Sequence, residues 1–453
     1  MNRIKSALAL TDQTRDILVG SHVVPRTGGV FARNFPFQRA VVVADSNTWA
    51  VAGRAVAASL RAEGVAMDRP IIYPGQPALS ADDGRVRDLR TRLADTSAVA
   101  CSIAAGSLND IVKLASHEVG RSYLNVCTAA SVDGYTSFGA SIAVGGVKRS
   151  VPCPAPRAVV VPLDLMAAAP SRMTAAGYGD LAEKVTAGAD WILADALGLD
   201  PIDPVVWELV HDPVQGALCD PAALARGEIG ALGQLAEALV LSGLGMQILR
   251  SSRPASGAGH YFSHQWEMEG YGRGWEPPLS HGFKVGLGAV AMCALYEKLL
   301  ELDLADFDVK ARVESWPTPA ADAARVRSLQ MLPAVQTDAL AQSAAKQVPK
   351  SEAGLWLEKV KAAWPAARER IAVQVRPAAA MADGLARVGA VSHPSQIGVS
   401  PEDFKLKYFQ AQTLRSRYTA LDLLAQLGLL SETVEGLFAP GGYWFEAAVP
   451  AAG

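Results

Sequence analysis

The feature that most constrains the fold of this chain of 453 residues is a change in the periodicity of its hydrophobic residues near Pro170. Before it, short apolar runs rich in β-branched residues alternate with helix-like stretches of about 10 to 15 residues. The strand candidates are residues 40–44, 71–73, 98–103, 123–127 and 158–162. Continuous apolar strands separated by helices are typical of a parallel sheet that helices cover on both faces. We therefore predict a Rossmann-like α/β domain over residues 1–169.

After Pro170 the strand-like runs nearly vanish and helical periodicity dominates. The strongest helical segments are residues 176–196, 229–249, 284–300, 352–373 and 414–426. An alanine-rich stretch over residues 318–350 is typical of surface helix and loop. These patterns predict an all-helical second domain over residues 170–453.

Composition narrows the classes of function. The net charge of -3 and the scattered lysines and arginines provide no basic surface for nucleic acid. The five cysteines form no CxxC pair, which favours a reducing cytoplasmic setting over a disulfide framework. The N-terminus does not resemble a secretory signal, and glycine, proline or charge interrupts the longest apolar runs. We expect a soluble cytoplasmic protein without a membrane span.

A small-residue turn, AAGSLND, follows the apolar run at residues 98–103 and precedes a predicted helix at residues 110–115. Such a turn lets backbone N–H groups approach a phosphate at the positive end of a helix. Tight strand-to-helix connections also use glycine for purely structural reasons. Asp45 ends an earlier strand, where a carboxylate either binds a cofactor ribose or simply stabilises a turn.

Three of the seven histidines lie within 22 residues of one another, at His260, His264 and His281. The spacing of four between the first two places both on one face of a helix. Stacked structural histidines are the alternative interpretation, and we interpret the isolated histidines as structural. These are His22, His117, His211 and His393.

Asp180 lies in the segment GYGDL, which we expect to open the first helix of the helical domain. An aspartate at that place is usually a helix cap. Beside the histidines it has a second interpretation, because one carboxylate and two neutral imidazoles suit a divalent metal with open positions. A polar loop at residues 128–137 follows another strand, where an open parallel sheet gathers its ligands. Its hydroxyls and its one carboxylate suit a nicotinamide or a polyol, although polar loops are also common without a ligand.

These segments occur in an order that resembles the glycerol-1-phosphate dehydrogenases. The matching stretches are AAGSLNDIVK, TAASVDGYTSFGASI, GYGDLAEKVTAGADW, RPASGAGHYFSHQWEM, SHGFKVGLG and RSRYTALDLLAQLG. That group, with its nickel- or zinc-dependent bacterial branch, belongs to the superfamily of iron-containing alcohol dehydrogenases, glycerol dehydrogenase and dehydroquinate synthase. The resemblance covers about residues 38–300 and 385–430 and implies a dehydroquinate synthase-like fold.

The resemblance implies a role for each candidate residue. The metal ligands are Asp180, His260 and His281. His264 and Asp133 are implied as catalytic residues, and both, with Lys184, as substrate contacts. The cofactor contacts are Asp45, Gly106, Ser107, Leu108, Thr128, Ser131, Asp133 and Ser137. One departure is that Ala104 and Ala105 replace the glycine or serine usual in the family's turn, and their methyl groups crowd the pyrophosphate.

The implied reaction interconverts sn-glycerol 1-phosphate and dihydroxyacetone phosphate with NAD or NADP and one divalent ion of zinc, nickel or iron. Further candidate phosphate contacts are Lys148, Arg149 and Arg253, each of which is also explained as a solvated charge. The alternatives are a dehydrogenase of glycerol or another polyol, a dehydroquinate synthase-like cyclase, and a catalytically silent binding protein. The intact Asp and His set disfavours the silent protein, and we expect a homo-oligomer.

Overall fold

The predicted parallel sheet is present in the N-terminal part of the chain. The computed structural model describes residues 2–145 and 147–447. Within them, six parallel strands pair in the order β1-β8-β5-β4-β2-β3. Their bounds are β1 (Asp16–Gly20), β2 (Ala40–Asp45), β3 (Ile71–Tyr73), β4 (Val99–Ala104), β5 (Leu124–Cys127) and β8 (Ala158–Pro162). The central strands are buried along almost their whole length, as a sheet covered on both faces requires.

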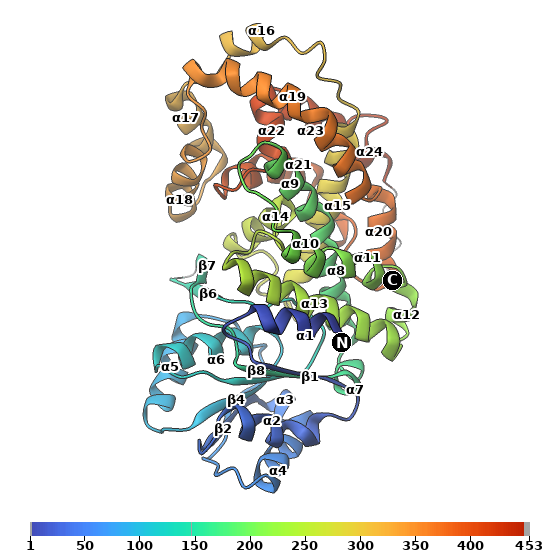
Figure 1. The fold of residues 1–453 in the computed structure, drawn as a ribbon. Coiled ribbons are helices and arrows are strands. Elements are labelled where there is room, and N and C mark those ends of the chain that lie inside the picture. Colours follow the sequence, from blue (N-terminus) through green and yellow to red (C-terminus); the bar gives the residue numbers. More distant parts are fainter. Residues whose placement is uncertain (1, 146, 448–453) are drawn as a thin grey trace.

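Helices cover the two faces of this sheet (Figure 1). Those nearest to it are α2 (Thr27–Asn34), α4 (Arg54–Ala62), α5 (Asp83–Ala94) and α6 (Gly106–Glu118). The side chain of Val42 packs with the first two helices, while Val41 and Val43 pack with the last two. Successive strand residues thus enter opposite cores, as the pleat demands.

Three strands were not predicted from the sequence. β1 pairs with β8 at the edge of the sheet. β6 (Ala140–Val144) and β7 (Val147–Val151) form an antiparallel hairpin outside the main sheet. This hairpin extends from the α/β part toward the helical part (Figure 1).

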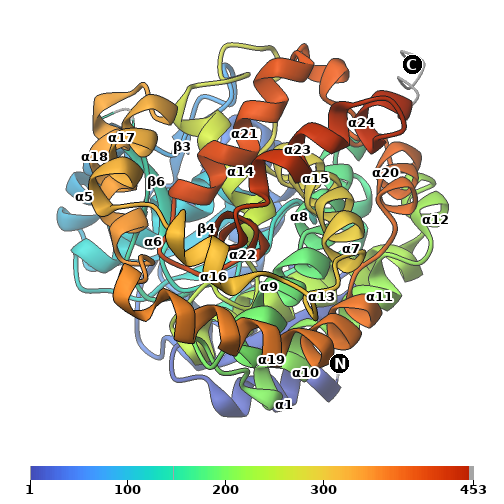
Figure 2. The ribbon, with the colours of Figure 1, turned by 90° about the horizontal axis from the view of Figure 1, so that it is seen from above.

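The remainder of the described chain is helical, so the predicted α/β plus all-α fold class is confirmed. The elements that follow the last strand are α7 (Leu163–Ala167), α8 (Ser171–Ala182), α9 (Lys184–Ala196), α10 (Pro204–Val210), α11 (Asp212–Ala217), α12 (Pro221–Ala225), α13 (Ile229–Leu249), α14 (Ala258–Met268), α15 (His281–Leu300), α16 (Val309–Glu314), α17 (Pro319–Leu329), α18 (Pro333–Ala344), α19 (Lys350–Gln374), α20 (Ala378–Arg387), α21 (Pro401–Thr413), α22 (Ala420–Leu427), α23 (Leu430–Phe438) and α24 (Tyr443–Glu446). Viewed from above, these helices lie over the sheet and α15 runs among them (Figure 2).

Two segments predicted as single helices are not continuous helices in the structure. The segment 176–196 is divided between α8 and α9, which meet at Glu183. The segment 414–426 is a connection followed by α22, because Thr419 and Asp422 form a capping box that starts a new helix there.

α13 is long and apolar enough to cross a membrane, but 67% of its apolar stretch is buried inside the protein. The N-terminal helix α1 (Asn2–Leu10) packs along it, so the first residues of the chain lie against the helical part (Figure 1). α13 is therefore a core helix in this structure. The division of the chain at residue 169 stays a prediction.

α8 and α15 approach each other backbone to backbone. A Cβ atom on Gly282 would lie 1.9 Å from the carbonyl oxygen of Ala176, and one on Gly179 would lie 2.3 Å from the carbonyl oxygen of Gly282. No side chain larger than hydrogen fits at either position without moving a helix. Since Asp180 lies on α8 and His281 begins α15, this contact places two of the candidate ligands side by side.

We predict that Gly282→Ala lowers the free energy of unfolding by about 1 to 3 kcal/mol, because the added methyl group overlaps backbone atoms. Gly216→Ala in α11 is the matched control, since a Cβ atom added there would meet no atom within 4 Å and alanine favours helix by about 0.5 to 1 kcal/mol. Denaturant unfolding measures both. Equal stability of the two variants would contradict the close approach of α8 and α15.

Candidate active site

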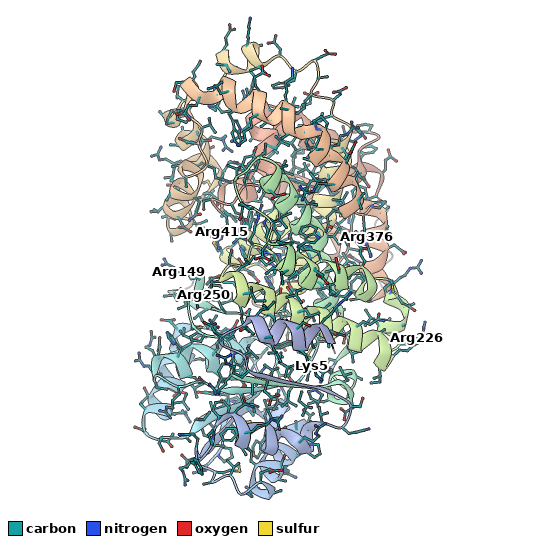
Figure 3. The ribbon with its side chains drawn as sticks, in the orientation of Figure 1. Lys5, Arg149, Arg226, Arg250, Arg376 and Arg415 are labelled. Carbon is teal, nitrogen blue, oxygen red and sulfur yellow. The ribbon has the colours of Figure 1, made fainter. Side chains whose placement is uncertain are left out.

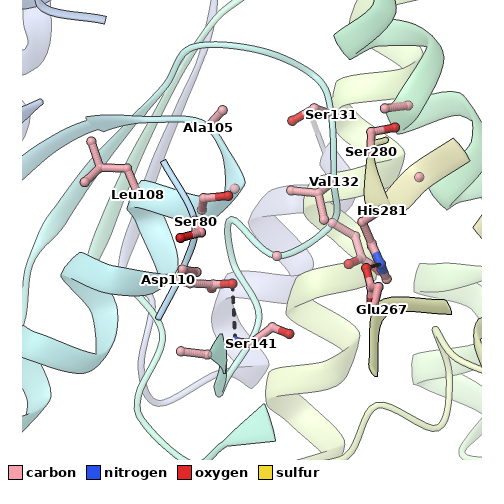
Figure 4. A pocket seen from close by; sticks show the side chains of 18 of the residues that line it. Ser80, Ala105, Leu108, Asp110, Ser131, Val132, Ser141, Glu267, Ser280 and His281 are labelled. Atoms are coloured by element: carbon pink, nitrogen blue, oxygen red, sulfur yellow. Dashed lines mark hydrogen bonds and ion pairs between the residues drawn. The ribbon is translucent and has the colours of Figure 1, made fainter. Parts of the chain in front are cut away.

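A cavity of about 1620 Å³ lies between the α/β part and the helical part and is lined by both. Its walls contain most of the residues that the sequence singled out. Figure 4 shows this cavity with Ala105 and Leu108 on one side and Glu267 and His281 on the other. A cleft of this kind between two lobes is where ligands most often bind.

Asp180, His260 and His281 come together from three different helices, α8, α14 and α15, and the two histidines line this cavity. The Oδ1 atom of Asp180 lies 3.5 Å from Nε2 of His260 and 4.0 Å from Nε2 of His281. One ligand atom from each residue lies within 4.8 Å of the others. Oδ1 is buried and accepts no hydrogen bond, so a buried lone pair and two imidazole nitrogens converge on one point. This donor set fits a divalent cation.

The predicted place of Asp180 in its helix was wrong. The residue lies in the last turn of α8, not at the start of a helix, and so it does not act as an N-cap. Its Oδ2 atom accepts a hydrogen bond from the backbone N–H of Asp133 at 2.9 Å. The carboxylate therefore joins the polar loop of the α/β part to the helical part.

Each histidine of the triad contacts a glutamate carboxylate through its Nδ1 atom. Oε2 of Glu183 lies 2.6 Å from Nδ1 of His260, and Oε1 of Glu267 lies 2.8 Å from Nδ1 of His281. These contacts orient both rings so that Nε2 faces Asp180, in the way second carboxylates position metal-bound histidines. Neither glutamate was identified from the sequence. Their spacings, three residues after Asp180 and seven after His260, were the available signal.

The charges around the triad are strongly coupled. Burial lowers the pKa of His260, but the carboxylates of Glu183 and Asp180 together outweigh this and raise it to about 9. Burial opposes ionisation of Asp180, yet the ammonium of Lys184 and the imidazoles of the two triad histidines together hold the pKa of that carboxyl well below its usual range. A cation that binds here must displace the proton of His260, so its binding competes with protons.

Lys184 requires a correction. Its side chain is completely buried and does not line the cavity, so it does not contact the substrate as predicted. Its Nζ atom lies 2.8 Å from Oδ2 of Asp133 and 3.6 Å from Oδ1 of Asp180. The lysine therefore balances two buried carboxylates behind the site.

Asp133 lines the cavity, but its carboxylate is occupied. Oδ2 accepts a hydrogen bond from the hydroxyl of Ser242 at 2.8 Å and pairs with Lys184. This arrangement supports a positioning role for Asp133. Nothing in it leaves Oδ2 free as a base.

His264 lies beside the triad. Its ring is centred 6.1 Å from that of His260 and 6.3 Å from that of His281, and it lines the cavity. Burial and the positive charge of Arg415 hold the pKa of His264 well below its usual range. A neutral imidazole therefore faces the space next to the candidate metal position.

The cofactor candidates lie on the opposite wall. α6 begins at Gly106, not at Asp110 as predicted, and no side chain caps its N-terminus at Ala105. Gly106, Ser107 and Leu108 form its first turn and line the cavity, with their N–H groups at the positive end of the helix. Ala105 lines the cavity too, while Ala104 is buried in β4. Of the two alanines, Ala105 is therefore the one whose methyl group reaches the cavity wall.

The loop at residues 128–137 also reaches the cavity, through Thr128, Ser131, Asp133 and Ser137. The ammonium of the buried Lys113 supports this loop, because it donates to carbonyl oxygens of Gly134, Ser137 and Gly139 at 2.9 to 3.0 Å. This lysine was not identified from the sequence. Its place in the helix that follows the turn gave no sign of the contact.

Asp45 stabilises a turn, as one of its sequence interpretations had it, and it also lines the cavity. Its Oδ1 atom caps α3 (Ser46–Thr48) by accepting the N–H groups of Asn47 and Thr48 at 2.8 and 2.9 Å. The residue also lines the cavity, and no donor among the described residues reaches Oδ2. One oxygen therefore remains available to a ligand.

The other candidate phosphate contacts differ in position. Lys148 lines the cavity and its Nζ atom lies 2.8 Å from Oε2 of Glu267. Arg253 is buried and donates to the carbonyl oxygens of Asp190 and Tyr418, so it points away from the cavity. Arg149 is exposed on the β6–β7 hairpin, on the same side of the molecule as Arg250 and Arg415 (Figure 3).

Comparison with known proteins agrees with this arrangement. Residues 18–170 match the family described as iron-containing alcohol dehydrogenase. A glycerol-1-phosphate dehydrogenase [NAD(P)+] of Bacillus velezensis is 35% identical over 63% of this chain and 73% of its own length. One of Bacillus subtilis is 30% identical over 85% of each chain. A probable glycerol dehydrogenase from Sinorhizobium meliloti shares the fold, with a TM-score of 0.57 and 16% identity over 94% of this chain and 99% of its own.

The fold and the site together define an oxidoreductase of the iron-containing alcohol dehydrogenase class. Within that class, the chain belongs to the glycerol-1-phosphate dehydrogenase family. The family predicted from the sequence motifs is thereby confirmed.

We predict that His281→Ala lowers bound metal and activity together, because it removes one of three protein ligands. His264→Ala is expected to keep most of its metal and to lose rate, since its ring lies beside the triad and not in it. Elemental analysis and a rate assay measure both properties. Full metal occupancy in His281→Ala, or equal metal loss in the two variants, would show that the ligand set is different.

Proposed function

We propose that the protein is a metal-dependent, NAD(P)-linked dehydrogenase that interconverts sn-glycerol 1-phosphate and dihydroxyacetone phosphate. The observation that carries this proposal is the Asp180, His260 and His281 triad, whose two histidines line the same cavity as the dinucleotide turn at Gly106. The names of the bacterial relatives support the substrate pair.

The triad residues hold the cation, and Glu183 and Glu267 keep the two imidazoles in place. When bound, a zinc, nickel or iron ion supplies the Lewis acidity that lowers the pKa of a substrate hydroxyl. The N–H groups at the start of α6 bind the cofactor pyrophosphate, and the loop at residues 128–137 positions the nicotinamide ring. When bound, the nicotinamide exchanges the hydride.

The side chains around the substrate contribute proton transfer and positioning. His264 lies next to the triad and lines the cavity, which places it to accept the hydroxyl proton during oxidation and return it during reduction. Asp133 accepts a hydrogen bond from Ser242, and this bond positions the loop to which Asp133 belongs. The two walls hold the reacting carbons close together, which is the main entropic contribution of such a cleft.

A cytoplasmic location and a homo-oligomeric assembly belong to the same proposal. All five cysteines are free thiols and four of them are buried, which supports a reducing compartment.

A substrate panel at defined metal loading tests the proposal. We expect dihydroxyacetone phosphate to be reduced with a kcat/KM at least about tenfold above that of dihydroxyacetone, because a phosphate contributes charge-assisted hydrogen bonds. Preference for dihydroxyacetone would identify a glycerol-type dehydrogenase. Phosphate release from a keto-sugar phosphate without net NADH consumption would identify a dehydroquinate synthase-like cyclase.

Asp45 yields a prediction for the cofactor. Its free oxygen accepts a hydrogen bond from the 2'-hydroxyl of NAD and repels the 2'-phosphate of NADP, so we expect NADH to be preferred by about 5- to 30-fold. Asp45→Ser keeps a residue that caps α3 and is expected to narrow this gap by improving NADPH use. The kcat/KM values for both cofactors measure this. If Asp45→Ser leaves the ratio of kcat/KM for NADH to that for NADPH unchanged, Asp45 acts only as a helix cap and does not contact the ribose.

A further inference from the structure

The two walls of the cavity carry opposite charge. The α/β wall contributes one cation, Lys148, and the carboxylates of Asp45, Asp82, Asp83, Asp110 and Asp133. The helical wall contributes one carboxylate, Glu267, and the cations Arg172, Arg250, Arg273, Lys284 and Arg417. A ligand that fills the cavity therefore meets positive charge on the helical wall, which also carries His260 and His281.

Most of the cations on the helical wall already have partners. Arg172 donates to the carbonyl oxygen of Pro278, and Arg417 donates to that of Ser256. Arg250 pairs with a surface carboxylate, and Arg273 is exposed to solvent. These contacts account for their charges without a ligand.

Lys284 is different. It is only 5% exposed, yet among the described residues no acceptor lies within hydrogen-bond or ion-pair distance of its ammonium. The carboxylate that acts on it, Glu267, is already engaged by Lys148 and His281. Burial, with Lys148 and Arg273 nearby, lowers the pKa of Lys284 to about 8.

Burying an unpaired ammonium costs free energy of folding. A cavity that retains one is therefore suited to bind an anion, which pairs with that charge. Lys284 lies three residues after His281 on α15, which places both side chains on one face of that helix. About 5.4 Å of helix separates successive turns, which is comparable with the span of a three-carbon chain. An anionic group at one end of a small polyol therefore reaches Lys284 while the other end lies at the triad.

We propose that Lys284 binds the phosphate group of the substrate and determines the preference for phosphorylated over unphosphorylated polyols. Lys148 and Arg273 flank it and add to the positive field at that end of the cavity. The assignment rests on the proposed function for the position of the polyol. It separates the substrate phosphate from the cofactor pyrophosphate, whose candidate site is the start of α6 on the opposite wall.

The test compares Lys284→Met with Lys298→Met. Both substitutions remove a lysine charge from α15, but Lys298 lies on the surface and pairs with Glu301. Inorganic phosphate is the probe, and the melting temperature of the metal-loaded protein, saturated with NAD so that the cofactor site is filled, is the first readout. We expect phosphate to raise the melting temperature of wild type and of Lys298→Met but not of Lys284→Met.

The second readout is kinetic. We expect Lys284→Met to raise the KM for dihydroxyacetone phosphate about 10- to 100-fold, because a charge-assisted hydrogen bond is lost, while the KM for dihydroxyacetone and the metal content stay unchanged. Methionine in place of an unpaired ammonium is also expected to raise the melting temperature without phosphate, so misfolding does not obscure the result.

Two results would overturn the inference. A phosphate-dependent shift in Lys284→Met equal to that of wild type would show that the anion binds elsewhere. An unchanged KM for dihydroxyacetone phosphate in that variant would show the same for the substrate. Failure of the proposed function looks different, because a wild type that does not reduce dihydroxyacetone phosphate would still report phosphate binding through its melting temperature.

Discussion

The buried carboxylate of Asp180 is the interaction on which the rest of the site depends. An isolated charge at this depth would cost several kcal/mol, so every group around it must compensate. The backbone N–H of Asp133 and the ammonium of Lys184 compensate from one side, and the imidazoles of His260 and His281 approach from the other. Because Asp133 belongs to the α/β part and the others to helices, this one side chain sets the position of the two walls relative to each other.

Close packing makes that arrangement possible. The glycines of α8 and α15 bring the two helices into backbone contact, so Asp180 and the first residue of α15 lie within ligand distance. The carboxylates of Glu183 and Glu267 then orient the imidazoles through Nδ1. Metal binding, the packing of α8 against α15 and the charge on Lys184 therefore all depend on the position of Asp180. A change in any one of them alters the other two.

Periodicity and motifs predicted much of this from the sequence. The alternation of apolar strands and helices predicted the sheet, and the four-residue spacing of His260 and His264 placed both on one face of a helix, as α14 has them. Local patterns do not report what a side chain meets across the fold. Lys184 was therefore predicted at the substrate although it is completely buried behind Asp133, and the supporting glutamates Glu183 and Glu267 went unnoticed. The β6–β7 hairpin was missed because its short strands belong to no larger sheet.

The central claim is that Asp180, His260 and His281 bind one catalytic cation. Anomalous diffraction from crystals of the metal-loaded protein measures this most directly. We predict a single strong peak per chain within about 2.0 to 2.2 Å of one oxygen of Asp180 and of Nε2 of both histidines. A peak at other residues, or an empty triad in a protein that retains its metal-dependent activity, would contradict it.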